Sequence, residues 1–233
     1  MDKAEFDKFA DEYRSLHAAN IAISGETPDY FADYKIKDLA EEYLSCGGKA
    51  SGGPTVLDFG AGIGTSVPFV RKYLPSARLT CLDVSTKSIE IGKCRFHGEA
   101  QFVQFDGTTV PFPDASFDIV FAACVFHHID HDEHVALLVE LRRVLSPGGM
   151  LFVFEHNPYN PLTVKTVRDC PFDENARLIP APDMCRRISA AGFSGTRIRY
   201  RIFFPRGLRA LRLLEKKMTW LPLGAQYYTL AVK

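Results

Sequence analysis

The chain has 233 residues, no formal net charge and 46% hydrophobic residues. This length and composition are typical of one sizeable globular domain with a complete core, and they exclude a low-complexity chain. A pI near 7.0 argues against a nucleic-acid-binding protein, and no apolar run approaches the roughly 18 residues of a membrane span.

Cysteine usage and the first residues bear on the compartment. The six cysteines include no Cys-x-x-Cys pair, and several lie inside apolar runs. They are typical of buried thiols in a reducing compartment and not of a disulfide framework. Residues 1–7 are charged and lack the apolar stretch of a signal peptide. We therefore expect a cytoplasmic protein.

Charge is unevenly distributed along the chain. Residues 1–60 carry twelve Asp or Glu against six Lys or Arg, whereas residues 186–217 carry ten Lys or Arg against one acid, Glu215. The basic segment would suit an anionic substrate or an anionic surface.

The segment 1–48 is predicted to form a helical cap that precedes a core of residues 49–233. Apolar residues recur at helical spacing between Phe6 and Leu16. A break at 24–28 separates this run from a second helical segment, and a glycine-rich connector then leads into the core.

A short apolar run at 55–59 is followed by the turn Gly60-Ala-Gly-Ile-Gly64 and by a predicted helix at 65–74. Glycine lets the backbone turn sharply and lets a ligand approach where a Cβ would block it. The start of the following helix adds oriented N–H groups. A strand, a glycine turn and a helix in this order predict a nucleotide-binding element.

Four further apolar runs of strand length follow, and helical patterns separate most of them. They cover 77–82, 101–105, 117–124 and 150–154. This alternation predicts a doubly wound α/β sheet with ligands at the carboxyl ends of its strands. Asp83 follows the second strand about twenty residues after the glycine turn, the spacing at which a carboxylate reaches ribose hydroxyls.

The last third of the chain completes the pattern with less regular spacing. A loop-rich insertion at about 156–182 leads to a helix that ends near Gly192. A strand at 196–204, a helix at 207–218 and a final strand at 226–232 follow.

Several of these stretches carry recognisable motifs, namely 56–64, 105–107 with 111–120, and 141–151. They resemble motif I, the adenine-contact turn with the fourth strand, and the helix, turn and fifth strand of the class I S-adenosylmethionine-dependent methyltransferases, in particular the small-molecule enzymes of the type 11/12 group. The resemblance is strong from about residue 39 to residue 154. It implies a Rossmann-like sheet of seven strands, mostly parallel, whose last strand is antiparallel and forms a hairpin with the strand before it.

The resemblance also implies S-adenosylmethionine as the cofactor and a role for each strand end. The motif I backbone would face the methionine portion, Asp83 would bond the ribose diol and Val84 would lie against the adenine. Asp106 would accept from the adenine amino group beside the N–H of Gly107. The implied cofactor-binding residues are Asp58, Gly60, Ala61, Gly62, Gly64, Asp83, Val84, Asp106, Gly107, Ala123 and Cys124.

Other proteins with a glycine turn fit this sequence less well. A nicotinamide dehydrogenase carries Gly-x-Gly-x-x-Gly, not Gly-x-Gly-x-Gly. The chain also lacks the Asn/Asp-Pro-Pro-Tyr/Phe motif of amino-group DNA and RNA methylases and the Pro-Cys nucleophile of cytosine methylases. A non-catalytic, cofactor-binding regulatory subunit stays open as an alternative of another class.

Histidines gather after the fourth and fifth strands, beside the expected position of the transferred methyl group. His127 and His156 are the candidate catalytic residues, because histidine titrates near neutral pH and an oxygen or nitrogen acceptor must lose a proton. Cys124, His127, His128 and His156 form an alternative metal set. Cys and His stand there where metal-dependent relatives use Glu, so we expect no metal; His128 is expected to cap or pack.

Two further histidines, His131 and His134, are expected at a solvent-exposed helix start. Asp130 or Asp132 would then act as the N-cap of that helix.

The acceptor is the least determined part of the prediction. The candidate substrate-binding residues are Tyr30, Tyr34 and Tyr159, and either Tyr13 or the segment 30–35 is expected to close over the cofactor. We expect methyl transfer to a small molecule, at oxygen in preference to nitrogen or carbon, and no nucleic-acid partner. The oligomeric state stays open.

The segment 206–218 has two interpretations. Leu208, Leu211, Leu214 and Met218 form one helical face, and Arg209, Arg212 and Lys216 form another. The first interpretation is a helix packed on the core with a solvated basic face. The second is an amphipathic helix in peripheral contact with a membrane, which would suit a lipid-linked or phosphorylated glycan or isoprenoid precursor as the acceptor.

Overall fold

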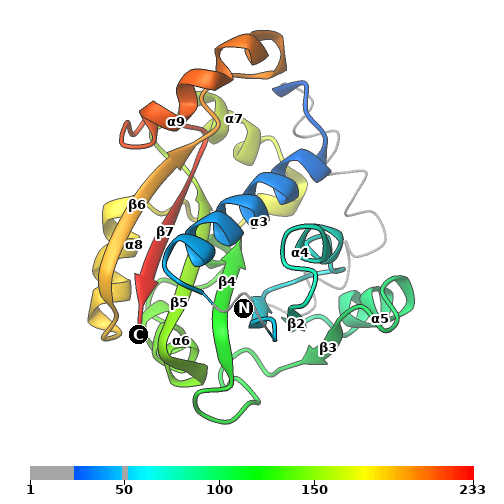
Figure 1. Ribbon diagram of the computed structural model, residues 1–233. Helices are drawn as coiled ribbons and strands as arrows, with labels where there is room; N and C mark the ends of the chain where they lie inside the picture. The colour runs from blue at the N-terminus through cyan, green and yellow to red at the C-terminus, as the bar shows by residue number, and fades with distance from the viewer. Residues whose placement is uncertain (1–23, 49–51) are drawn as a thin grey trace.

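A seven-stranded sheet runs through the molecule in the order β3-β2-β1-β4-β5-β7-β6 (Figure 1). The computed structural model describes residues 24–48 and 52–233. Its strands are β1 (Thr55–Phe59), β2 (Arg78–Asp83), β3 (Gln101–Gln104), β4 (Phe117–Ala123), β5 (Leu145–His156), β6 (Ser194–Arg201) and β7 (Gln226–Val232). The expected helix between Phe6 and Leu16, with Tyr13, lies outside the described residues.

Strand directions confirm the expected fold class. β1 pairs in parallel with β2 and β4, β2 pairs in parallel with β3, and β4 pairs in parallel with β5. β7 runs antiparallel to both β5 and β6. The sheet is therefore Rossmann-like with an antiparallel last strand. The carboxyl ends of β1 to β5 meet at one edge, where the residues that follow these strands can face a common ligand.

Helices cover both faces of the sheet. One face carries α3 (Pro28–Ser45), α4 (Val67–Tyr73) and α5 (Thr86–Arg95), and the other carries α6 (His134–Val144) and α8 (Ala181–Ala190). Val56 of β1 packs in the same cluster as Ile36 and Val67, whereas its neighbour Leu57 packs with Leu138. Successive strand residues point to opposite faces, which explains this division. Each fully buried aliphatic side chain contributes about 1.5–3 kcal/mol.

Helix α3 crosses the front of the sheet in Figure 1 and is fastened to β6 by an ion pair. The Nη2 of Arg201 lies 2.9 Å from Oδ1 of Asp38, and its Nε lies 2.6 Å from Oδ2. This pair, with the buried Ile36 and Leu39, fixes the angle at which α3 approaches the carboxyl edge of the sheet. As a result Lys35, which is 8% exposed, turns inward to the end of β4.

The insertion after β5 is more regular than the sequence suggested. It contains α7 (Pro161–Arg168) and the short 3-10 helix η3 (Pro171–Asp173). Asn160 caps α7 by accepting from the N–H groups of Leu162 and Thr163, both at 3.1 Å. Its side-chain amide donates to the carbonyl of Leu223 at 2.8 Å, which ties the insertion to the turn before β7.

The expected environment of His134 is wrong. His134 is fully buried, its Nε2 lies 3.0 Å from the carbonyl oxygen of Ile129, and its ring packs edge-on against Phe126. Glu133 occupies the N-cap of α6 without a side-chain cap bond, so neither expected aspartate has that role. The short 3-10 helix η2 (Phe126–His128) shifts the start of α6 and turns the imidazole into the core.

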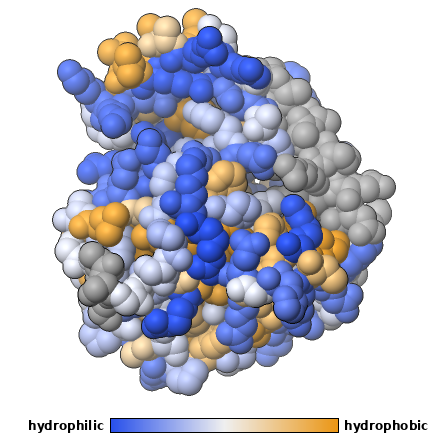
Figure 2. Space-filling model, turned by 45° about the vertical axis from the view of Figure 1, so that its right-hand side comes forward, coloured by the Kyte–Doolittle hydropathy of each residue, from blue (hydrophilic) through white to orange (hydrophobic). Residues whose placement is uncertain are grey.

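The first interpretation of segment 206–218 is also wrong. It forms the 3-10 helix η4 (Arg206–Leu214) and the short α9 (Glu215–Met218) at the top of Figure 1, and η4 buries none of its residues. Arg212 turns inward instead. It pairs with Glu26 at 2.7 Å and lies over the Tyr30 ring. The leucines therefore face outward, and Figure 2 shows apolar side chains gathered at this end. Within the described residues, no helix has the length and apolarity needed to cross a bilayer.

Candidate functional site

The turn between β1 and α4 requires glycine for two different reasons. Gly60 has a φ of +74°, and a Cβ there would lie 2.5 Å from the side chain of Val125. Gly62 has a φ of +54°, and a Cβ there would meet no described atom within 4 Å. The N–H groups of Gly60 and Ala61 donate to the carbonyl of Leu82 at 2.8 and 3.1 Å. The turn is thus fixed to β2 and leaves room for a ligand beside Gly62.

Two carboxylates flank this turn. Asp83, at the end of β2, accepts the N–H of Gly62 on Oδ2 at 2.7 Å and the N–H of Ser85 on Oδ1 at 2.9 Å. Asp58 is buried within β1 and accepts a hydrogen bond from the hydroxyl of Ser66. Burial raises the pKa of Asp58 to about 7, against the opposing effect of the Ser66 hydroxyl. Asp83 is therefore the carboxylate that is bound directly to the backbone of the turn.

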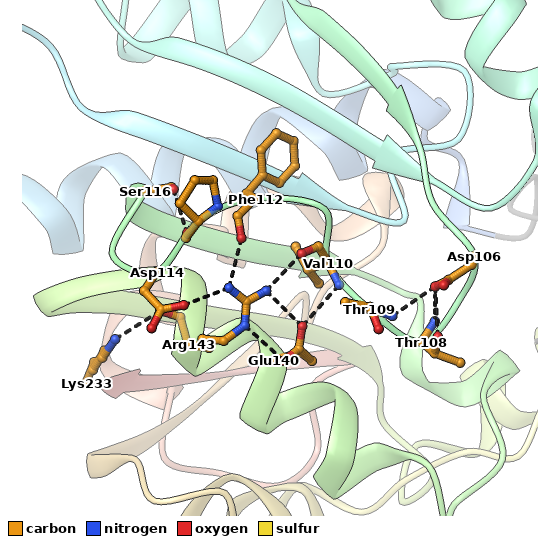
Figure 3. A network of polar contacts seen from close by, with 11 residues as sticks. Asp106, Thr108, Thr109, Val110, Phe112, Asp114, Ser116, Glu140, Arg143 and Lys233 are labelled. Atoms are coloured by element: carbon orange, nitrogen blue, oxygen red, sulfur yellow. Dashed lines mark hydrogen bonds and ion pairs between the residues drawn. The ribbon is translucent and has the colours of Figure 1, made fainter.

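A third carboxylate, Asp106, shapes the loop after β3 (Figure 3). Its Oδ1 accepts the N–H groups of Thr108 and Thr109 at 2.8 and 2.9 Å and the Thr108 hydroxyl at 2.9 Å. These bonds lower the pKa of Asp106, the one from the Thr109 N–H most strongly. Gly107 follows with a φ of +90° beside Val84. Asp106 and Gly107 therefore lie at the same sheet edge as Asp83.

Arg143 of α6 holds this loop in place (Figure 3). Its guanidinium donates to the carbonyls of Val110 at 2.9 Å and Phe112 at 2.8 Å, and it pairs with Asp114 at 2.9 Å. Glu140, one turn earlier in α6, accepts from Arg143 at 2.9 and 3.0 Å and from the N–H of Val110 at 3.2 Å. Because the planar guanidinium reaches several acceptors at once, one residue fixes the whole loop.

The end of β4 places a thiol beside a buried ammonium group. Cys124 follows Ala123 with a φ of +61°, in the left-handed region, and its N–H donates to the carbonyl of Phe154 at 2.8 Å. Its Sγ lies 3.2 Å from Nζ of Lys35. Burial would raise the pKa of this thiol, but Lys35 and His156 outweigh it and lower that pKa to about 6. The group is therefore largely a thiolate at neutral pH.

Side chains from α3, β5 and β7 converge on the same point. Gln226 accepts the hydroxyl of Tyr34 on Oε1 at 2.5 Å. Its Nε2 lies 3.4 Å from Nδ1 of His156 and 3.8 Å from Sγ of Cys124. His156 is half-buried, so its ring lies at the edge of this cluster.

The other candidate base, His127, is enclosed by carboxylates. Its Nδ1 lies 2.5 Å from Oε2 of Glu155, whose Oε1 accepts the N–H groups of Val125 and Phe126. Burial would lower the pKa of His127, but Glu155 and Asp173 outweigh it and raise that pKa to about 10. His127 is thus positively charged at neutral pH in this arrangement.

Asp173 of η3 bridges His127 and its neighbour. Its Oδ1 lies 3.7 Å from Nε2 of His127 and 3.4 Å from Nε2 of His128. Burial and the positive His127 lower the pKa of His128 to about 3. Burial acts to raise the pKa of Asp173, but the surrounding histidines outweigh it and lower that pKa to about 2.

The structure brings most of the sequence-derived candidates to one sheet edge. The glycine turn, Asp83, the loop after β3, and the ends of β4 and β5 all meet there. Tyr34 reaches this cluster through Gln226, whereas Tyr30 packs under Arg212 and Tyr159 is 54% exposed in the insertion.

Sequence reasoning missed four residues of this site, which are Arg143, Glu155, Asp173 and Gln226, and it included Lys35 only as the end of the segment 30–35 without a role of its own. Glu155 had a usable signal, because an acid at the end of an otherwise apolar strand needs a buried partner. Lys35 and Asp173 had none, because the angle of α3 and the path of the insertion bring them in.

Comparisons with known proteins agree with this geometry. Residues 57–153 match a family model described as a methyltransferase domain. The ubiquinone/menaquinone biosynthesis C-methyltransferase UbiE of Ectopseudomonas mendocina is 35% identical over 123 residues, and that of Hahella chejuensis is 34% identical over 120 residues. The match covers 48% of this chain in both cases, and 46% and 47% of those proteins, so the chain matches about half their length.

Solved structures resemble the whole described fold. A Thermotoga maritima S-adenosylmethionine-dependent methyltransferase, titled a possible histamine N-methyltransferase, has a TM-score of 0.67 at 17% identity and covers 99% of both chains. Phosphoethanolamine N-methyltransferase 2 of Haemonchus contortus, solved with S-adenosylmethionine, has a TM-score of 0.62 at 18% identity and covers 98% of this chain and 60% of that one. At such identities the likeness concerns the fold.

Proposed function

We propose that this chain is a class I S-adenosylmethionine-dependent methyltransferase, as the methyltransferase-domain match and the UbiE relatives support, and that it transfers a methyl group to a small-molecule acceptor at the edge of the sheet beside Cys124 and His156. The observation that carries the proposal is the meeting of the glycine turn, Asp83 and the loop after β3 at that edge. S-Adenosylmethionine, when bound, supplies a methyl group already activated by its sulfonium.

The residues present fit this cofactor. The open space beside Gly62 would take its central part. The fixed carboxylate of Asp83 suits a ribose diol, and Asp106 with Gly107 suits an adenine rim. The buried ammonium of Lys35, near Asp58 and Cys124, suits the carboxylate of the methionine portion.

His156 is the better placed of the two candidate bases. It is half-buried, and its Nδ1 faces Gln226. His127 is buried, and its Nδ1 is held by Glu155 at 2.5 Å, so an acceptor cannot reach it as readily. In this account His156 removes the acceptor's proton, while Tyr34 and Gln226 orient its ring.

The acceptor is proposed to carry an acidic hydroxyl. Oxygen is the favoured point of methylation, because the site offers a base to remove the proton of a hydroxyl. Carbon is the second candidate, because the UbiE relatives are named as C-methyltransferases. In a hydroxylated ring, loss of the same proton would activate either atom.

The test is an acceptor screen with S-adenosylmethionine that follows S-adenosylhomocysteine release and identifies the methylated atom by mass spectrometry and NMR. We expect turnover with a hydroxylated aromatic compound, and we expect His156→Gln to lower kcat by about 10²–10⁴-fold with unchanged cofactor affinity. Turnover equal to wild type in His156→Gln would remove the base assignment. Absence of turnover across the screen, with the cofactor bound, would favour a regulatory subunit.

We also propose peripheral contact with an anionic membrane surface. Leu213 and Trp220 are 87% and 70% exposed, and they lie with Leu208, Leu211, Leu214 and Leu223 at one end of the molecule. The basic side chains Arg209, Lys216 and Lys217 are exposed in the same segment. Apolar and basic groups together are typical of an interfacial helix.

Vesicle sedimentation tests this contact. We expect binding to vesicles with phosphatidylglycerol, weaker binding to pure phosphatidylcholine, and loss of binding in Leu213→Glu. Val139→Glu, at an exposed position of α6, is the matched control and should bind as wild type. Equal behaviour of the two variants would contradict the contact.

A further inference from the structure

Three donor atoms meet between η2 and η3, outside the residues assigned to the cofactor. One ligand atom each of His127, His128 and Asp173 lies within 4.8 Å of the other two. The side chain of His127 is fully buried, and those of His128 and Asp173 are 11% and 12% exposed. Two imidazoles and one carboxylate are a donor set that divalent transition metals prefer.

His127 presents a buried nitrogen that protein atoms do not satisfy. Within the described part of the chain, its Nε2 has no hydrogen-bond partner. The nearest acceptor, Oδ1 of Asp173, lies 3.7 Å away, which is too long for a hydrogen bond. A buried polar atom in this state is costly unless a further group completes it. A cation bound at this atom would displace the proton that His127 carries without it.

Glu155 orients His127 as a metal site requires. Its Oε2 lies 2.5 Å from Nδ1 of His127, which leaves Nε2 directed at the cluster. Glu155 is itself fixed by the N–H groups of Val125 and Phe126 at 3.2 and 2.8 Å. A carboxylate that holds the second nitrogen of a ligating imidazole fixes both its tautomer and its direction.

The spacing of the donors fits a tetrahedral ion. Ligands about 2.0–2.1 Å from zinc stand roughly 3.3 Å apart in a tetrahedron. Oδ1 of Asp173 lies 3.4 Å from Nε2 of His128 and 3.7 Å from Nε2 of His127. The two imidazole donors lie within 4.8 Å of each other, so both would move toward the ion on binding.

We propose that His127, His128 and Asp173 bind one Zn²⁺ ion, with Glu155 as the residue that orients His127. This site differs from the histidine and cysteine set weighed from the sequence, because Asp173 enters from the insertion. Three protein ligands leave a fourth position for water. The ion would fasten η3 to the end of β4, and thus the insertion to the candidate active site.

The test is metal binding by the full chain after treatment with a chelator. Calorimetry with ZnCl₂ should show one zinc ion bound tightly per chain, and the Co²⁺-loaded protein should show the visible absorption spectrum of a tetrahedral site. Asp173→Asn and His128→Gln should each weaken zinc binding at least ten-fold, and Glu155→Gln by about 10–100-fold. Asp173→Asn is nearly isosteric at a partly exposed position, and an unchanged circular dichroism spectrum would confirm that it folds.

Asp169→Asn and His97→Gln are matched controls at exposed positions, and both should bind zinc as wild type. Absence of zinc binding at 100-fold excess over protein would overturn the proposal. So would binding that Asp173→Asn leaves unchanged, because the metal would then be held elsewhere, for example by the exposed Cys46 or Cys94.

Discussion

At the residue scale, the pair of Lys35 and Cys124 sets the charge at the end of β4. An ammonium 3.2 Å from a thiol favours the thiolate, and the neighbouring His156 adds to the lowering of the thiol pKa. The pair also links α3 to the sheet edge. Changes in α3 are therefore expected to alter the chemistry of the site as well as its shape.

Alkylation of Cys124 measures this effect. The pKa of the thiol is lowered to about 6, so carbamidomethylation by iodoacetamide, followed on the Cys124 peptide by mass spectrometry, should have its midpoint near that pH. Lys35→Met removes the ammonium and should move the midpoint upward by about one pH unit or more. The same midpoint in both proteins would show that Lys35 does not act on the thiol.

Asp58 provides a second test through the pH dependence of stability. Its pKa is raised by burial to about 7 in the folded protein, against about 3.9 in an unfolded chain. The folded state therefore binds this proton more tightly. The group stabilises the fold most below pH 4, and this contribution is lost as the pH rises to 7.

Urea unfolding of cofactor-free wild type and Asp58→Asn at pH 5 and pH 8 isolates the group. From pH 5 to pH 8, the free energy of unfolding of the variant should rise by roughly 1–3 kcal/mol relative to that of wild type. The reason is that wild type must bury a charged carboxylate at pH 8 and the variant does not. A difference between the two proteins that does not change with pH would contradict the assignment.

At the scale of elements, α6 controls the loop that should hold the adenine. Arg143 and Glu140 lie one turn apart on α6 and together contact the loop at several points. Between Asp106 and Asp114, the loop packs against the core only through Val110 and Phe112. Its position therefore depends on these polar bonds, and a distant helix affects cofactor binding.

Arg143→Met should release this loop. We expect the free energy of unfolding to fall by about 1–3 kcal/mol, since several hydrogen bonds are lost and Glu140 loses its positively charged partner. We also expect weaker S-adenosylmethionine binding by calorimetry. Arg168→Met, at a 75% exposed arginine, is the control. Unchanged cofactor affinity in Arg143→Met would mean that the loop keeps its position without the hydrogen bonds of Arg143.

The elements also show where sequence reasoning succeeds. β1, the glycine turn and β7 lie where the apolar runs predict them, because a strand that is buried on both faces leaves a continuous apolar run in the sequence. The helical pattern predicted for segment 206–218 is confirmed. The interpretation in which its leucine face packs on the core is wrong. Periodicity identifies an amphipathic pattern, yet Arg212 finds Glu26 and the Tyr30 ring only in three dimensions.

At the scale of the whole molecule, the sequence motifs predict the fold, but they predict only part of the candidate site. The hydrogen bond from the N–H of Gly62 to Asp83 can be predicted from sequence, because both residues lie at a fixed spacing within one βαβ unit. The groups around the proposed acceptor come from α3, the insertion and β7, which lie far apart in sequence. Their meeting depends on tertiary packing, and no local pattern encodes it.

Cofactor binding is the central claim, and isothermal titration of the full chain with S-adenosylmethionine, S-adenosylhomocysteine and NAD tests it most directly. We predict micromolar binding of both adenosyl ligands and no detectable binding of NAD. In Asp83→Ala, the binding free energy of S-adenosylmethionine should weaken by about 1–3 kcal/mol. Silence toward both adenosyl ligands would contradict the account, and unchanged affinity in Asp83→Ala would contradict the ribose assignment.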